Sequence, residues 1–161
     1  MDKQKNKSIN IHQIKHKDTE KGQSFTEFAL SITFLLILLA GIVDIGRLAF
    51  NYIGMRDASQ EGVVYGSIYP VNCPEIVDRA LAMVVDPNTV DVQVFITHDG
   101  TTDTCAAQTA NVCTGDAIQV RIVDSDFPIT MPFLGTIIGS QTISLNAEIS
   151  GTVLRPSCTS P

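Results

Sequence analysis

A single carboxylate stands at the edge of the longest apolar run in the chain. Glu27 is followed by Phe28 and by a run that is apolar, apart from two hydroxyl residues, up to Val43. An ionisable residue inside a membrane helix is costly to bury, so it is by default expected to have a function. The alternative is that Glu27 lies at the membrane interface, where the dipole of a helix N-terminus favours a negative charge.

After residue 22 the chain has few groups suited to catalysis. His98 is the only histidine there, and no lysine follows Lys21. The sequence has neither a G-x-S-x-G pattern nor a glycine-rich phosphate loop followed by lysine. A serine or cysteine triad would have to use His98, which lies in a polar stretch. We therefore predict that the chain is not an enzyme and uses no cofactor.

Oxygen ligands gather in two places, at Asp99 and Asp103 beside His98, and at Asp124 and Asp126. Such ligands suit Ca²⁺, but neither group has the spacing of an EF-hand loop. The cysteines form no C-x-x-C pair and have no histidine pair near them, which argues against zinc. We predict no metal site.

All four cysteines follow the apolar run: Cys73, Cys105, Cys113 and Cys158. An even number of cysteines in an exported domain indicates two disulfides, for which three connectivities are possible. Cys105 and Cys113 close a short polar loop, so we predict a Cys105–Cys113 disulfide. A Cys73–Cys158 disulfide follows by elimination. Free thiols are the alternative.

Charge is divided unevenly along the chain. Up to residue 22, six lysines stand against three carboxylates, a net of +3, whereas the remainder has five arginines and 14 carboxylates, a net of −9. A basic segment before an apolar run stays in the cytoplasm. We therefore expect a single-pass protein of the cell membrane whose acidic part lies outside. It has no basic patch that would suit nucleic acid.

Three regions are expected. Residues 1–22 are polar and lysine-rich, which indicates a leader peptide. Residues 23–69 are predicted to hold one long helix, with a membrane span at about 25–43. Residues 70–161 are predicted to form an extracytoplasmic domain. The alternative to a retained span is a cleaved signal peptide, although the apolar run ends without a clear A-x-A site.

The predicted helix runs from about Ser24 to Ile68, because apolar residues keep three- and four-residue spacing beyond the span and no proline interrupts them. Asp44 and Arg47 are three residues apart on one face at the outer end of the span. We interpret them as a helix-boundary pair in solvent. Gly62 and Gly66 are expected to let the helix pack closely against the chain's own sheet.

Alternating apolar residues predict strands around 90–96, 118–123 and 143–149. A short helix is expected at 75–84. Residues 98–115 are predicted to be a long polar surface loop, and residues 128–139 an apolar helix or turn packed on the sheet. The predicted fold class is therefore α+β, with a long N-terminal transmembrane and amphipathic helix followed by a small antiparallel sheet of three or four strands.

Several motifs of the N-terminal region resemble the TadE-like family, the pseudopilins or minor pilins of the tight-adherence (Tad, or Flp) pilus. The motifs are Gly22-Gln23-Ser24, Glu27-Phe28-Ala29-Leu30, Gly41-Ile42-Val43-Asp44-Ile45-Gly46-Arg47 and Asp57-Ala58-Ser59-Gln60-Glu61-Gly62. The resemblance covers about Lys21 to Tyr65. The C-terminal half is similar to the family only in its pattern of elements, which is pilin-like.

The resemblance implies a role in pilus assembly for adhesion. A prepilin peptidase would cut between Gly22 and Gln23, and Glu27, followed by Phe28, would set the register of the subunit by pairing with a new N-terminal amine. The implied partners are membrane lipid, the peptidase, other pilins and the Tad platform proteins. Asp44 with Arg47 would then be a possible contact to another pilin. The alternative function is a membrane-anchored or secreted binding domain unrelated to pili.

Overall fold

The computed structural model describes the chain from residue 19 to residue 155, apart from residues 108–111 and 132–133. The chain divides into two compact units, Met1–Ala40 and Gly41–Pro161. The fold class is α+β, as predicted: a long apolar N-terminal helix is followed by a small antiparallel sheet of four strands.

The N-terminal helix α1 (Thr19–Gly66) confirms the predicted helix. It begins five residues before the predicted start at Ser24, because Glu20 and Lys21 are good helix formers and nothing breaks the helix before the apolar run. It ends two residues before Ile68. Pro70 follows shortly after, and a proline cannot continue a helix.

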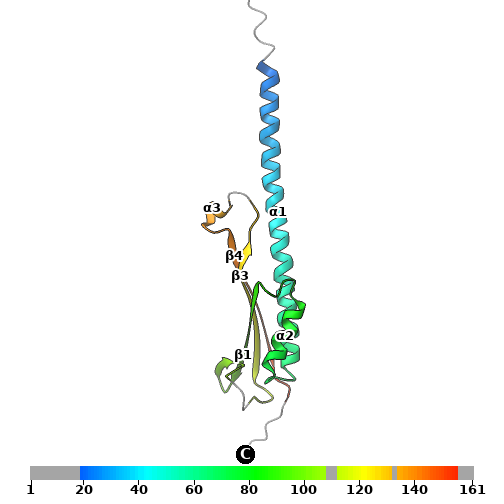
Figure 1. Cartoon of the computed structure of the whole chain (residues 1–161), viewed down its shortest axis with the longest axis vertical. Helices are drawn as coiled ribbons and strands as arrows, with labels where there is room; N and C mark the ends of the chain where they lie inside the picture. The colour runs from blue at the N-terminus through cyan, green and yellow to red at the C-terminus, as the bar shows by residue number, and fades with distance from the viewer. Residues whose placement is uncertain (1–18, 108–111, 132–133, 156–161) are drawn as a thin grey trace, which may run out of the picture. The chain divides into compact units, whose positions relative to one another are not determined.

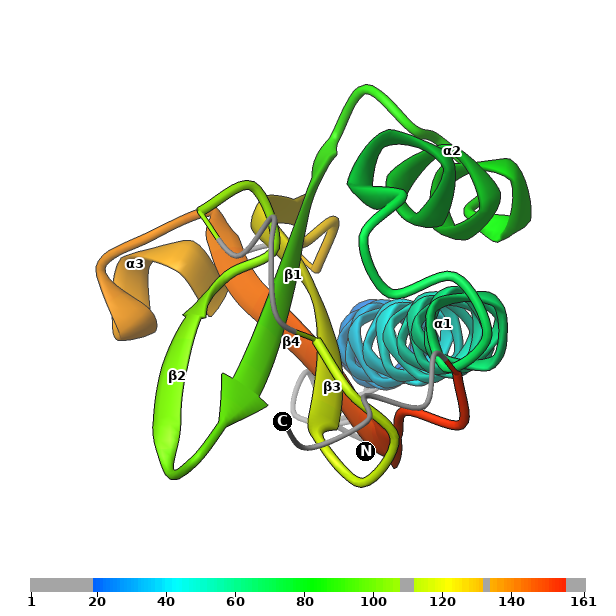
Figure 2. The same cartoon turned by 90° about the horizontal axis from the view of Figure 1, so that it is seen from below.

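The sheet has the strand order β2-β1-β3-β4, and all neighbouring strands are antiparallel. Its strands are β1 (Val90–His98), β2 (Thr101–Thr104), β3 (Ala117–Pro128) and β4 (Thr142–Thr152). Helix α2 (Cys73–Met83) corresponds to the short helix predicted at 75–84. Figure 2 shows α2 and the C-terminal part of α1 side by side on one face of the sheet.

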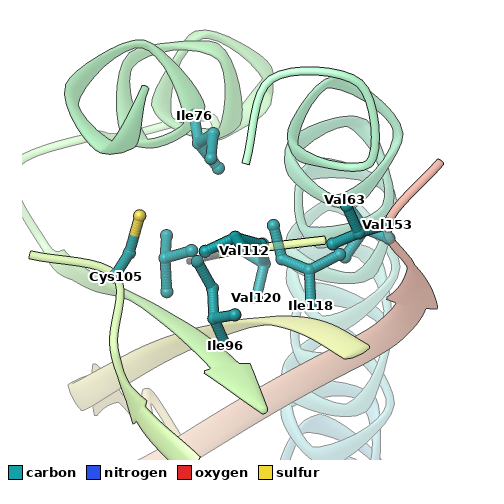
Figure 3. Packing of buried hydrophobic residues seen from close by; sticks show 9 residues of the cluster. Val63, Ile76, Ile96, Cys105, Val112, Ile118, Val120 and Val153 are labelled. Carbon is teal, nitrogen blue, oxygen red and sulfur yellow. The ribbon is translucent and has the colours of Figure 1, made fainter. Parts of the chain in front are cut away.

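The core lies between these two helices and the sheet. Ile76 of α2 and Val63 of α1 point toward fully buried side chains of β1 and β3 (Figure 3): Ile96, Ile118 and Val120. A second buried cluster continues along α1 with Met55 and Ala58 against Ile122. The alternation that predicted the strands therefore reports which face of the sheet is buried.

The glycines of α1 in this unit have two different environments. A Cβ atom at Gly66 would come within 2.3 Å of Ile118 Cδ1, and one at Gly62 within 3.3 Å of both methyl groups of Val120. Added Cβ atoms at Gly46 and Gly54 would meet nothing within 4 Å. The predicted packing of Gly62 and Gly66 against the chain's own sheet is confirmed.

Strand β2 corrects the predicted loop at residues 98–115. Asp99 and Gly100 have φ angles of 50° and 78°, so they form a two-residue turn that joins β1 to β2. An Asp-Gly pair is the preferred sequence for such a turn, because both positions need a positive φ. The sequence therefore held a hairpin signal that the polar composition of the segment concealed.

The segment between β3 and β4 contains the short helix α3 (Leu134–Ile138), which agrees with the predicted helix or turn. The prediction that this segment packs on the sheet is only partly correct, because Ile137 and Ile138 are 80% and 54% exposed. Figure 1 places α3 at the end of the sheet away from α2. Just before it, the register of β3 against β4 shifts between Asp124 and Phe127.

Candidate functional site

The predicted processing and register residues lie on an exposed part of α1. Gly22, Gln23, Glu27 and Phe28 are all exposed, and the Gly22–Gln23 peptide bond lies inside the helix, close to its start at Thr19. The Gln23 Nε2 atom donates a hydrogen bond to Glu27 Oε1 at 3.5 Å. Among the residues that the structure describes, no basic group forms an ion pair with Glu27.

The helix around Glu27 has an apolar surface that nothing in its own unit covers. Phe25, Leu30 and Phe34 are between 70% and 74% exposed, and the other large apolar residues of this stretch are also exposed or half-buried. α1 is the one helix within the described residues that is long and apolar enough to cross a membrane. Its surface therefore suits lipid or other apolar helices.

Asp44 is paired with Arg47, as predicted, but its carboxylate is not in solvent, contrary to our expectation. It is only 9% exposed and accepts hydrogen bonds from the backbone N–H groups of Thr130 at 3.0 Å and Met131 at 2.5 Å. The Thr130 hydroxyl donates a third hydrogen bond to the same carboxylate. Arg47 Nη1 lies 3.7 Å from Asp44 Oδ1 and is a secondary partner.

The role of Asp44 could not be found from the sequence, because its partners lie 86 and 87 residues away. The carboxylate satisfies backbone donors of the segment between β3 and β4 and so fastens that segment to α1. Arg47, in turn, lies over the ring of Phe127 at 5.6 Å from its centroid.

The outward side of α1 remains largely apolar from Ile45 to Gly54. Ile45, Phe50 and Ile53 are 70%, 69% and 57% exposed, and the two open glycines, Gly46 and Gly54, lie among them. Small residues let two helices approach closely. This side of α1 is thus available for another helix, whereas the opposite side is filled by the sheet.

The disulfide connectivity differs from the predicted one. Cys73, at the start of α2, is bonded to Cys105, just after β2, with a Cα–Cα distance of 5.8 Å. The predicted Cys105–Cys113 and Cys73–Cys158 pairings are therefore wrong. The physical reason is the missed hairpin, which carries Cys105 back under α2. Cys113 is also disulfide-bonded, and Cys158 lies outside the described residues.

The remaining polar residues that we singled out have structural partners. His98 Nδ1 lies 2.9 Å from both carboxylate oxygens of Asp116, and Asp116 also accepts the backbone N–H of Cys113. Asp124 accepts the backbone N–H of Asp126 at the register shift of β3. Within the described part of the chain, no three His, Cys, Asp or Glu residues are grouped so that they could hold a metal ion.

The His98–Asp116 pair joins the end of β1 to the turn before β3. The hydrogen bond that His98 donates to Asp116 raises the pKa of His98, and the charges of Asp116 and Asp99 act in the same direction, whereas desolvation opposes them. A raised pKa in the folded state means that the protonated form stabilises the fold.

A family model described as TadE-like protein matches residues 22–63. The resemblance to the TadE-like family is thus confirmed over this segment, which begins at the predicted processing site and ends where α1 is packed on the sheet. Neither the search of curated proteins nor that of solved structures found a match.

We predict that Asp44→Ala lowers the free energy of unfolding by about 2–3 kcal/mol, since hydrogen bonds to a charged group are lost and their backbone donors are left without a partner. Arg47→Ala is the matched control and should cost less than about 1 kcal/mol, because the Arg47 side chain is 42% exposed and makes only the secondary contact to Asp44. Urea unfolding of the detergent-solubilised chain measures both. Equal losses in the two variants would contradict the role of Asp44.

We also predict that the contribution of His98 to stability is lost as the pH rises. The contribution of His98 is fully present below its unfolded pKa of about 6.5 and is lost as the pH passes through the raised pKa of the folded state. Thermal unfolding between about pH 6 and pH 9 tests this. In His98→Gln the decline should be smaller, and a decline as steep as that of the parent would show that other groups cause it.

Proposed function

We propose that this chain is a TadE-like pseudopilin, or minor pilin, that takes part in the assembly of a Tad (Flp) pilus for adhesion. The match of residues 22–63 to the TadE-like model carries this proposal, and the matched range includes Gly22, Gln23, Glu27 and the apolar run. The role is structural. The chain acts through contacts with lipid and other subunits and carries out no reaction.

The first step of the proposal is processing by a prepilin peptidase between Gly22 and Gln23. Both residues are exposed, and a Cβ atom at Gly22 would meet nothing within 4 Å. The exposure of this bond supports access by the peptidase. Cleavage would remove the leader with its net charge of +3 and leave an α-amino group on Gln23.

The second step concerns Glu27. Positions 23 and 27 lie on one face of α1, and the Gln23 side chain already reaches the Glu27 carboxylate across one helical turn. A new amine on Gln23, in the same chain or in a neighbouring subunit, would give Glu27 a cationic partner. In lipid an ion pair is worth far more than in water, so this pairing would fix the register of the subunit.

Orientation follows from charge. The lysines of residues 1–22 favour a cytoplasmic N-terminus, and the acidic remainder is favoured outside. The segment of about 25–43 spans the cell membrane once in this arrangement. The outward side of α1, with Ile45, Phe50 and Ile53, supports packing against other pilins after the helix has left the lipid. The remaining proposed partners are the prepilin peptidase and the Tad platform proteins.

We predict that Glu27→Ala impairs pilus assembly while the outer domain stays folded. The substitution removes the carboxylate that would pair with the new amine, and with it the interaction that sets the register of the subunit. Pili sheared from cells are quantified against the parent strain. Asp78→Ala, which removes an exposed carboxylate of α2 outside the matched segment, is the control.

Formation of the Cys73–Cys105 disulfide reports folding in both variants. Normal piliation in cells with Glu27→Ala would contradict the role given to Glu27. Loss of piliation in Asp78→Ala as well would mean that the assay reports general damage and not register.

A further inference from the structure

The segment between β3 and β4 contains exposed apolar residues and no charge. No charged residue occurs from Phe127 to Ala147. Within this stretch, Ile137 is 80% exposed and Ile138 is 54% exposed. Adjacent, strongly exposed isoleucines in an uncharged segment are suited to contact with an apolar surface. We call residues 129–131 and 134–139 the α3 loop.

The α3 loop is fixed beside the last turn of the proposed membrane span. Thr130 and Met131 donate their backbone N–H groups to Asp44, the residue that directly follows Val43. The sulfur of Met131 lies 3.5 Å from the Cβ position of Gly41. The start of the loop is therefore held at the level at which the helix leaves the lipid.

The charge of the outer part restricts how this region could meet a membrane. The chain after residue 22 has a net charge of −9, so an anionic lipid surface repels most of it. An apolar contact avoids this repulsion, and the α3 loop is an uncharged segment with exposed isoleucines at this end of the sheet (Figure 1). A second copy of the chain is the other conceivable occupant, but the position beside the span favours lipid.

We infer that the α3 loop is a second membrane contact, in which Ile137 and Ile138 enter the outer surface of the bilayer beside α1. This inference rests on the membrane span of the proposed function, but not on processing or pilus assembly. The hydrogen bonds of Asp44 hold the loop in place, and the contact restrains the outer domain against the membrane.

The absence of tryptophan from the chain permits a direct test. Ile137→Trp is prepared in the full chain and reconstituted in vesicles of phosphatidylcholine, with and without bromine on the acyl chains as a quencher. Leu154→Trp is the control. Leu154 is 62% exposed, and its backbone N–H donates a hydrogen bond to the carbonyl oxygen of Ser67, just after the C-terminal end of α1. Ser67 lies about 35 Å along the helix from Asp44 at 1.5 Å per residue.

A third variant, Phe34→Trp, reports the span itself. We expect strong quenching in Phe34→Trp and, in Ile137→Trp, a blue-shifted emission with quenching at least about twofold above that of Leu154→Trp, because interfacial residues enter the bilayer by about 5–10 Å. All three variants carry the same preference of tryptophan for interfaces, so that preference cannot produce the difference.

Three results would overturn the inference. Equal quenching in Ile137→Trp and Leu154→Trp, together with quenching of Phe34→Trp, would show that the helix spans the bilayer but the loop does not contact it. Absence of quenching in Phe34→Trp would show that the helix does not enter the bilayer, which would contradict both the span and the loop contact. In Ile137→Trp, a blue-shifted emission that brominated lipid does not quench, and whose shift disappears when the protein is diluted in lipid, would show that the loop contacts a second copy of the chain. If Ile137→Trp fails to form the Cys73–Cys105 disulfide, Ile138→Trp serves as the second reporter.

Discussion

The uncovered apolar surface of α1 between Phe25 and Val43 is the constraint on which the remaining features depend. Each large apolar side chain that stays in water forgoes about 1.5–3 kcal/mol of burial energy. Phe25, Leu30, Phe34 and their neighbours gain no such burial within their own unit. Lipid or apolar helices must supply it. In the proposed arrangement, the lysines before this segment and the acidic residues after it would lie on opposite sides of a membrane, and the Glu27 carboxylate would need a cationic partner.

The second half of α1 has two sides with different uses. Toward the sheet, Gly62 and Gly66 bring the helix backbone so close that Ile118 and Val120 occupy the space of their missing side chains. On the outward side, Gly46 and Gly54 face open space among exposed apolar residues. Glycine costs about 1 kcal/mol relative to alanine inside a helix. The open positions of Gly46 and Gly54 therefore support the packing against other pilins that we propose.

Local patterns in the sequence predicted the elements, whereas contacts between distant residues were beyond their reach. The apolar run and its spacing predicted α1, and alternation predicted β1, β3 and β4, since both depend on neighbours in the chain. The partner of Cys105 could not be read in the same way, because it depends on how the hairpin of β1 and β2 folds back under α2. Asp44 appeared to be solvated for the same reason: its partners come from the α3 loop, and no spacing rule links them.

The central claim is that the chain is cut before its apolar helix and keeps that helix. Intact-mass measurement with N-terminal sequencing of the protein from its native membrane tests it most directly. The account predicts a chain that begins at Gln23 and retains the segment of about 25–43. A chain that begins near Asp44 would identify a secreted domain and contradict the pilus assignment. An intact Met1 would identify an anchored protein that a prepilin peptidase does not process, and would equally contradict the claim.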